Sequence, residues 1–133
     1  APHPQCLIYP MTDPSCSSKS HDDFATCYFL THEVMQWFWK QLNESQANLS
    51  DPCFNLLQEH FYPLPKTLII TAGFDPLSDE GEEYARKIFE SGNAVDHIHY
   101  PHLIHGFVTM TALRASKEAS LDLINAYKTY FKK

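Results

Sequence analysis

Two residues with acid–base chemistry, Asp75 and His105, each follow a predicted strand. Asp75 comes shortly after the β-forming stretch 66–72, and His105 lies in the predicted loop after a strand at 95–100. In an open parallel α/β sheet, functional groups lie just beyond the carboxyl ends of the strands, and neighbouring strands are about 5 Å apart. We therefore expect both side chains at one edge of the sheet, close enough to meet.

An aspartate that accepts a hydrogen bond from an imidazole holds the tautomer of the ring and stabilises its protonated form. An Asp75–His105 pair would therefore supply two of the three members of a nucleophilic triad. Each residue also has a simpler interpretation. Asp75 suits the N-cap of a helix with Pro76 at its first position, and His105 alone is an ordinary loop histidine. The triad hypothesis depends on the two side chains being neighbours.

Three further histidines offer a metal-binding alternative. His97 and His99 alternate along the predicted strand and would share one of its faces, with His102 nearby. No carboxylate or thiolate stands at ligand spacing from them, and the four cysteines form no CxxC pair. We therefore expect neither a bound metal nor a cofactor.

Strands and helices are predicted to alternate along most of the chain. Strands are expected at residues 6–9, 66–72 and 95–100, with a helix from about 75 to 91 and a last helix at about 116–131, capped by Ser116. The last helix is expected to bury four apolar residues, Leu121, Ile124, Tyr127 and Phe131. The alternation predicts an α/β fold with about three parallel strands, right-handed crossovers and flanking helices.

A long excursion separates the first two predicted strands. Residues 11–30 are polar and are predicted as a loop, and Thr31 suits the N-cap of a helix that ends near residue 43. The apolar surface of this helix is broad and includes Met35, Trp37 and Phe38. Two interpretations stay open: the helix faces the core, or it is a cap whose aromatic face lines an apolar substrate pocket.

Size and charge narrow the classes of partner. The chain has 133 residues, which suits one domain with a modest core, and its formal net charge is −6. Because no basic stripe exists to neutralise phosphates, the composition argues against a nucleic-acid or anionic-membrane partner. No apolar run approaches the ~20 residues that a bilayer-spanning helix needs.

Three features of the sequence bear on the cellular compartment: its first residues, its cysteines and its glycosylation sequons. The first residues lack the charged start and long apolar segment of a signal peptide, and a strand follows almost at once, which suggests a cut or processed chain. The four cysteines are expected as free thiols, and we favour a cytoplasmic location. Export stays open because of those cysteines and two glycosylation sequons, Asn43-Glu44-Ser45 and Asn48-Leu49-Ser50.

One set of motifs resembles a known family, the hormone-sensitive-lipase-like esterases, which have the α/β-hydrolase fold. The similarity is to the C-terminal part of that family and is carried by Phe74-Asp75-Pro76-Leu77-Ser78-Asp79-Glu80-Gly81, followed by His105-Gly106-Phe107. It continues through Leu7-Ile8-Tyr9-Pro10, Leu30-Thr31 and Leu64-Pro65, and so spans about residues 4–131.

The resemblance implies a role for each matched residue. Asp75 corresponds to the triad acid of the family, and His105 to the general base that takes the proton of a serine and later gives it to the leaving alcohol. Met35, Trp37 and Phe38 lie in a segment that resembles the cap region, where the family shapes its acyl pocket.

The implied domain is a single partial α/β-hydrolase over residues 1–133. Residues 11–65 form its cap-like excursion and connection, and residues 66–133 carry the acid and the histidine. The GxSxG nucleophile elbow and the HGG-type oxyanion loop of the family have no counterpart in these residues, because the four glycines allow no GxSxG.

The resemblance therefore implies the C-terminal part of a serine carboxylic-ester hydrolase that is inactive as this chain alone. The alternative is a non-catalytic remnant that acts as a binding or interaction module. The strand at 6–9 is expected to leave an open apolar edge, since the nucleophile-bearing strand of the family would lie beside it. A complementing N-terminal half or a second copy is the expected partner at this edge, and a small-molecule ester is the expected substrate of the complete enzyme.

Overall fold

The computed structural model describes residues 3–45, 48–58 and 63–131. Within them, a sheet of three parallel strands forms the centre of the molecule: β1 (Gln5–Ile8), β2 (Thr67–Phe74) and β3 (Val95–Ile104). The strand order is β1-β2-β3, so β2 lies in the middle. The predicted α/β fold with parallel strands is confirmed.

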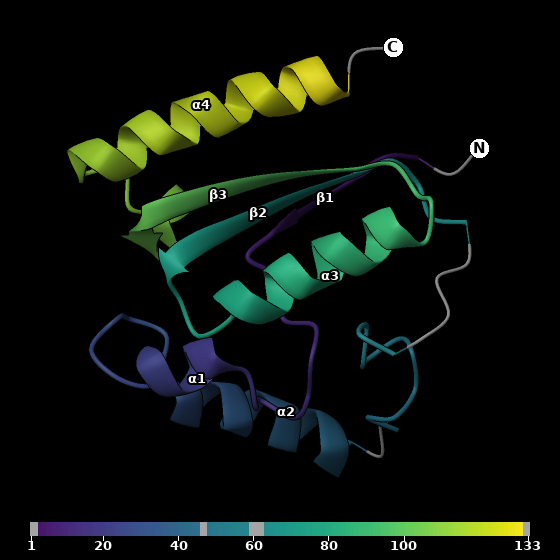
Figure 1. The fold of residues 1–133 in the computed structure, drawn as a ribbon. Coiled ribbons are helices and arrows are strands. Elements are labelled where there is room, and N and C mark those ends of the chain that lie inside the picture. The colour runs from purple at the N-terminus through teal and green to yellow at the C-terminus, as the bar shows by residue number, and fades with distance from the viewer. Residues whose placement is uncertain (1–2, 46–47, 59–62, 132–133) are drawn as a thin grey trace.

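Helices cover the two faces of the sheet (Figure 1). On one face, α3 (Ser78–Glu90) packs over Ile69 of β2 through Tyr84 and Ile88. On the other face, α4 (Arg114–Tyr130) packs with the short 3-10 helix η1 (Phe107–Thr109) over the opposite side of β2. Because both of its faces are covered, β2 is a nearly continuous run of buried apolar residues, as expected for the centre of a parallel sheet.

The helices of the excursion between β1 and β2 lie beside α3 (Figure 1), and Phe24 and Tyr28 of the excursion also contact Phe74 at the end of β2. The excursion contains α2 (His32–Glu44), which begins at the predicted cap, because the Thr31 hydroxyl accepts a hydrogen bond from the Val34 amide at 3.2 Å. It also contains α1 (Lys19–Asp23), so the prediction that residues 11–30 are all loop is wrong. Polar contacts with α3, rather than an apolar stripe, hold this short helix in place, which explains why periodicity did not reveal it.

The prediction for the buried face of the last helix is also wrong. Leu121, Ile124 and Tyr127 are exposed, and Phe131 is only partly buried against the core. The helix begins at Arg114, and its buried residues are Ser116, Ala119, Ser120 and Leu123. Small side chains let the helix approach the sheet closely, and the Ser120 hydroxyl is satisfied by the Ser116 carbonyl oxygen at 2.7 Å.

A register shift between β2 and β3 changes the end of the sheet. The strands pair regularly up to Ala72 opposite Tyr100, but Phe74 then pairs with Ile104, so Gly73 alone stands opposite residues 101–103. Strand β3 consequently continues to Ile104, beyond its predicted end near residue 100. A Cβ on Gly73 would lie 2.2 Å from the Pro101 carbonyl oxygen, so only glycine fits this close approach of two backbones.

Across the described ranges, no helix is both long and apolar enough to cross a lipid bilayer. The four cysteines are all free.

Candidate active site

The carboxyl ends of β2 and β3 bring Asp75 and His105 together. The Nδ1 atom of His105 lies 2.8 Å from the Oδ2 atom of Asp75, although the residues are 30 positions apart. The Asp75 side chain is completely buried and that of His105 is 20% exposed. Because a carboxylate only accepts hydrogen bonds, Nδ1 is the donor, and in the neutral ring Nε2 keeps the lone pair. This arrangement produces a histidine able to accept a proton at Nε2.

Local structure explains how Asp75 can do two things at once. Its Oδ1 atom accepts a hydrogen bond from the Leu77 amide at 2.9 Å, and its carbonyl oxygen accepts one from the Ser78 amide at 3.0 Å. Asp75 therefore supports the turn that starts α3 while Oδ2 faces the imidazole. Asp75 thus both supports the start of a helix and contacts the histidine. The predicted helix start needs one correction, because the first helical residue is Ser78 rather than Pro76.

A third residue at the same edge, Tyr9, was not among the predicted site residues. It follows β1 directly, and its ring centroid lies 4.2 Å from that of His105. Its backbone has a φ of 37°, which is rare for a residue with a side chain and typical of strained functional sites. Burial raises the pKa of the Tyr9 phenol, and the Asp75 charge adds to this effect, so the hydroxyl stays protonated at neutral pH. The carboxyl-end rule, applied to the first strand as to the other two, would have found it.

A groove of about 410 Å³ lies beside His105. Its lining is mostly apolar and comes from the end of β1, the excursion and the turn after Asp75: Ile8, Tyr9, Pro10, Met11, Leu30, Met35, Phe38, Leu77 and His105. Of the three predicted pocket residues, Met35 and Phe38 line this groove, whereas Trp37 does not and is 55% exposed. No Ser, Thr or Cys stands among the described residues that line it.

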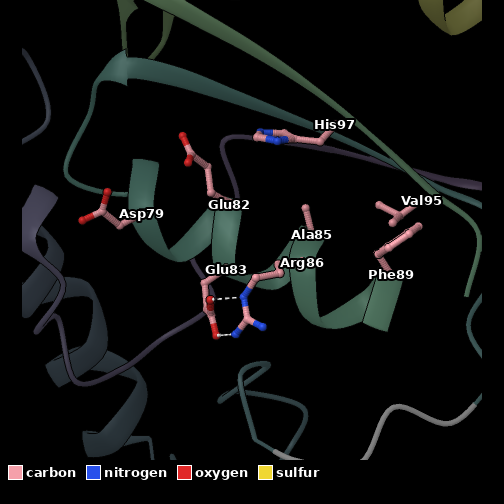
Figure 2. A pocket seen from close by; sticks show the side chains of 8 residues that line it. All are labelled: Asp79, Glu82, Glu83, Ala85, Arg86, Phe89, Val95 and His97. Atoms are coloured by element: carbon pink, nitrogen blue, oxygen red, sulfur yellow. Dashed lines mark hydrogen bonds and ion pairs between the residues drawn. The ribbon is translucent and has the colours of Figure 1, made fainter. Parts of the chain in front are cut away.

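The histidines of the metal alternative lie elsewhere. A second hollow, of about 570 Å³, has a lining that includes residues of α3 and β3. In Figure 2, His97 and Glu82 face the same space, and Glu83 pairs with Arg86. The Thr71 hydroxyl bridges the two strand histidines, at 2.7 Å from His97 Nε2 and 2.8 Å from His99 Nδ1. Among the described residues, no group of three or more His, Cys, Asp or Glu side chains is arranged to hold a metal ion.

We expect His97 to make folding stability depend on pH in the acidic range. Burial lowers the pKa of His97; Glu82 opposes this effect and His99 adds to it. The unfolded chain then binds the proton more tightly than the folded chain. Stability is therefore highest above the unfolded pKa of about 6.5 and falls as the pH drops through that value towards the folded pKa.

Replacing His97 by Gln should reduce this loss of stability, as measured by urea unfolding at about pH 7.5 and about pH 5.5. The exposed His102→Gln is the matched control, and it should keep the pH dependence of the original chain. An unchanged pH dependence in His97→Gln would contradict the prediction.

Comparison with known proteins places the chain in a family. A family described as alpha/beta hydrolase fold matches residues 1–109. The carboxylic ester hydrolase LipN of Mycobacterium tuberculosis (strain ATCC 25618 / H37Rv) is 37% identical over 129 residues, which cover 95% of this chain and 34% of LipN.

Two solved structures extend the similarity to three dimensions. An ester-hydrolase from the metagenome of Lake Arreo, complexed with a derivative of bipyridine phosphonate, is 38% identical, with a TM-score of 0.75 over 95% of this chain and 42% of its own. A variant of the esterase rPPE is 31% identical, with a TM-score of 0.86 over 98% of this chain and 42% of its own. The chain thus spans well under half the length of these relatives. It belongs to the α/β-hydrolase-fold family, in the hormone-sensitive-lipase-like esterase group.

Proposed function

We propose that this chain is the acid- and base-bearing part of a serine carboxylic-ester hydrolase, with Asp75 as the triad acid and His105 as the general base. The observation that carries the proposal is the 2.8 Å contact between a fully buried carboxylate and an imidazole that lines an apolar groove. The family membership gives the pair its chemical context, because carboxylic-ester hydrolysis is the activity named for relatives of this chain.

The proposed mechanism assigns one proton path to His105. Its Nδ1–H donates to Asp75, so Nε2 is free to take the proton from a serine hydroxyl as the serine attacks the ester carbonyl. The imidazolium that forms is stabilised by the buried Asp75 carboxylate. His105 then gives the proton to the leaving alcohol, and in the second half-reaction it activates water in the same way. Asp75 keeps its negative charge throughout.

The groove supports an ester with an apolar acyl or alcohol group as the substrate. Met35 and Phe38 come from α2 and contribute apolar surface opposite the Tyr9–Pro10 turn. Burying such surface favours binding by about 25 cal/mol for each Å² removed from water. We propose that Met35 and Phe38 contact the substrate, whereas the position of Trp37 outside this lining supports no such role for it.

We assign the serine and the oxyanion donors of the proposed enzyme to the part of its relatives' length that this chain does not span, which is 66% of LipN (100 − 34). Strand β1 supports a place for that part, because it is an edge of the described sheet and its four residues are only partly buried. An unpaired edge with apolar residues invites another strand. We propose that the nucleophile-bearing part pairs with β1; a second copy of the chain is the other partner that this edge suits.

The purified 133-residue chain should hydrolyse p-nitrophenyl butyrate no faster than buffer does. Loss of the serine and oxyanion donors removes most of the rate enhancement of about 10⁶-fold or more that a serine hydrolase provides. Joining the chain to the N-terminal part of LipN should restore turnover, and light scattering should report whether the unjoined chain self-associates. Turnover by the isolated chain that disappears in His105→Ala would contradict the proposal that the serine and the oxyanion donors lie outside this chain. An inactive but folded chimera would favour the non-catalytic binding module.

A further inference from the structure

A second carboxylate of the same motif, Glu80, is buried but has no part in the proton path. It lies in the first turn of α3 and is 2% exposed. Its Oε1 atom accepts hydrogen bonds from the amides of Thr12 at 2.6 Å and Asp13 at 3.3 Å, and its Oε2 atom lies 3.0 Å from His21 Nε2. A buried carboxylate needs such partners, and all three of these come from the excursion.

The neighbouring contacts reinforce this connection. The amide of Ser20 donates to Asp79 Oδ2 at 2.8 Å, and the Ser20 hydroxyl donates to the Pro76 carbonyl oxygen at 2.6 Å. The Thr12 hydroxyl donates to the Glu80 carbonyl oxygen at 3.2 Å. We call these five residues, Thr12, Ser20, His21, Asp79 and Glu80, the polar latch. These hydrogen bonds connect the excursion to the first turn of α3, which begins three residues after Asp75.

Apolar and aromatic contacts hold both sides of the segment next to the latch: Cys16 and Leu30 are buried in one apolar cluster, and the Phe24 and Tyr28 rings lie against Phe74. The hydrogen bonds that join α1 to α3 are those of the latch. Helix α1 is one of the shortest possible helices, and isolated helices below about 12 residues are marginal in water. Three non-glycine residues near it, Cys16, Cys27 and Phe29, have positive φ values, which persist only where the surroundings enforce them. Among the described residues, His21 Nδ1 has no hydrogen-bond partner, so the contact with Glu80 is the hydrogen bond of this buried ring.

The latched segment also forms a wall of the groove beside His105. Met11 directly precedes Thr12, and Leu30 ends the segment; both line the groove. We propose that Glu80 is a positioning residue: through Thr12 and His21 it holds residues 12–30 on α3, and so sets the place of Met11 and Leu30 in front of His105. This inference rests on the proposed function, in which the groove receives the ester.

Amide hydrogen exchange on the 133-residue chain tests the inference without any turnover. Glu80→Leu keeps a similar volume but leaves the Thr12 and Asp13 amides and the His21 ring without their acceptor. It should increase exchange in residues 12–30 by at least about tenfold, while β2 stays as protected as in the original chain. Glu80→Gln retains an acceptor oxygen and should restore most of the protection. Glu90→Gln, an exposed carboxylate at the end of α3, is the matched control and should change neither region.

A second measurement applies to the chimera with LipN. Glu80→Leu should raise KM for p-nitrophenyl butyrate about tenfold or more, while the pH midpoint that reports His105 stays in place, because the groove wall and not the Asp75 contact is altered. Unchanged exchange in residues 12–30, or equal loss of protection in β2, would overturn the positioning role. A chimera without any activity would count against the proposed function and would leave the exchange result to decide on Glu80.

Discussion

In the complete enzyme, His105→Ala should lower kcat by about 10⁵- to 10⁶-fold, the largest effect that we expect from any substitution in this chain. In the proposed mechanism, nothing then takes the proton of the serine or returns it to the leaving alcohol. The measurement is steady-state hydrolysis of p-nitrophenyl butyrate by the LipN chimera, with and without the substitution. His102→Ala, an exposed histidine on β3 three residues before His105, is the control and should retain kcat.

The companion substitution Asp75→Asn separates the two members of the pair. The amide keeps the shape of the side chain but also offers a donor to His105 Nδ1, which favours the tautomer with its proton on Nε2. We expect a decrease in kcat of about 10⁴-fold, smaller than for loss of the imidazole itself. A decrease of less than about tenfold in either variant would exclude these roles, because general acid–base catalysis alone contributes about 10²- to 10⁴-fold.

Gly73→Ala adds one methyl group, and we expect it to lower the free energy of unfolding more than any other single added methyl group in this chain. The new Cβ would lie 2.2 Å from the oxygen, 2.6 Å from the carbon and 2.7 Å from the Cα of Pro101, all of them backbone atoms that cannot rotate away. Overpacking usually costs about 1–3 kcal/mol, and a contact this short between two strands should reach at least the upper end of that range. Urea unfolding of the isolated chain measures the loss.

A second glycine serves as the control, because it separates the cost of a steric clash from the cost of an unfavourable backbone conformation. Gly92 has a φ of 79° and open space around its Cα, whereas Gly73 has no positive φ. Gly92→Ala should therefore cost only the conformational penalty of about 1–2 kcal/mol. Because Gly73 lies at the register shift just before Asp75 and His105, its substitution should also disturb the 2.8 Å contact. Equal losses in the two variants would contradict the packing argument.

The sequence predicts the central sheet and the Asp75–His105 contact because both follow from strong, local signals. The stretch Leu68-Ile69-Ile70 is β-forming and apolar without alternation, which is the pattern of a strand that is covered on both faces. Two residues that directly follow neighbouring parallel strands then meet at one edge of the sheet. Neither step requires knowledge of side-chain packing between distant elements.

The features that the sequence did not predict depend on contacts between segments that are far apart in the sequence. Glu80 looks like one more acidic residue in the first turn of a helix, and only the tertiary structure shows it buried against His21, 59 positions away. In α4, apolar size pointed to Leu121 and Ile124, but the helix buries the small residues Ala119 and Ser120 because it lies close to η1. Hydrophobic periodicity ranks residues by apolar size and cannot detect a face chosen for close approach.

The register of the sheet has a consequence for the order of folding. Strand β1 pairs with β2 across 62 positions, whereas β2 and β3 pair across 28 with α3 as their connection. Because closing a longer loop costs more chain entropy and slows the formation of its contacts, we expect the β2–α3–β3 unit to form first. Asp75 lies within that unit and His105 directly follows it, so we expect their contact to form early. Strand β1 and the groove wall then pack against a pair that is already in contact.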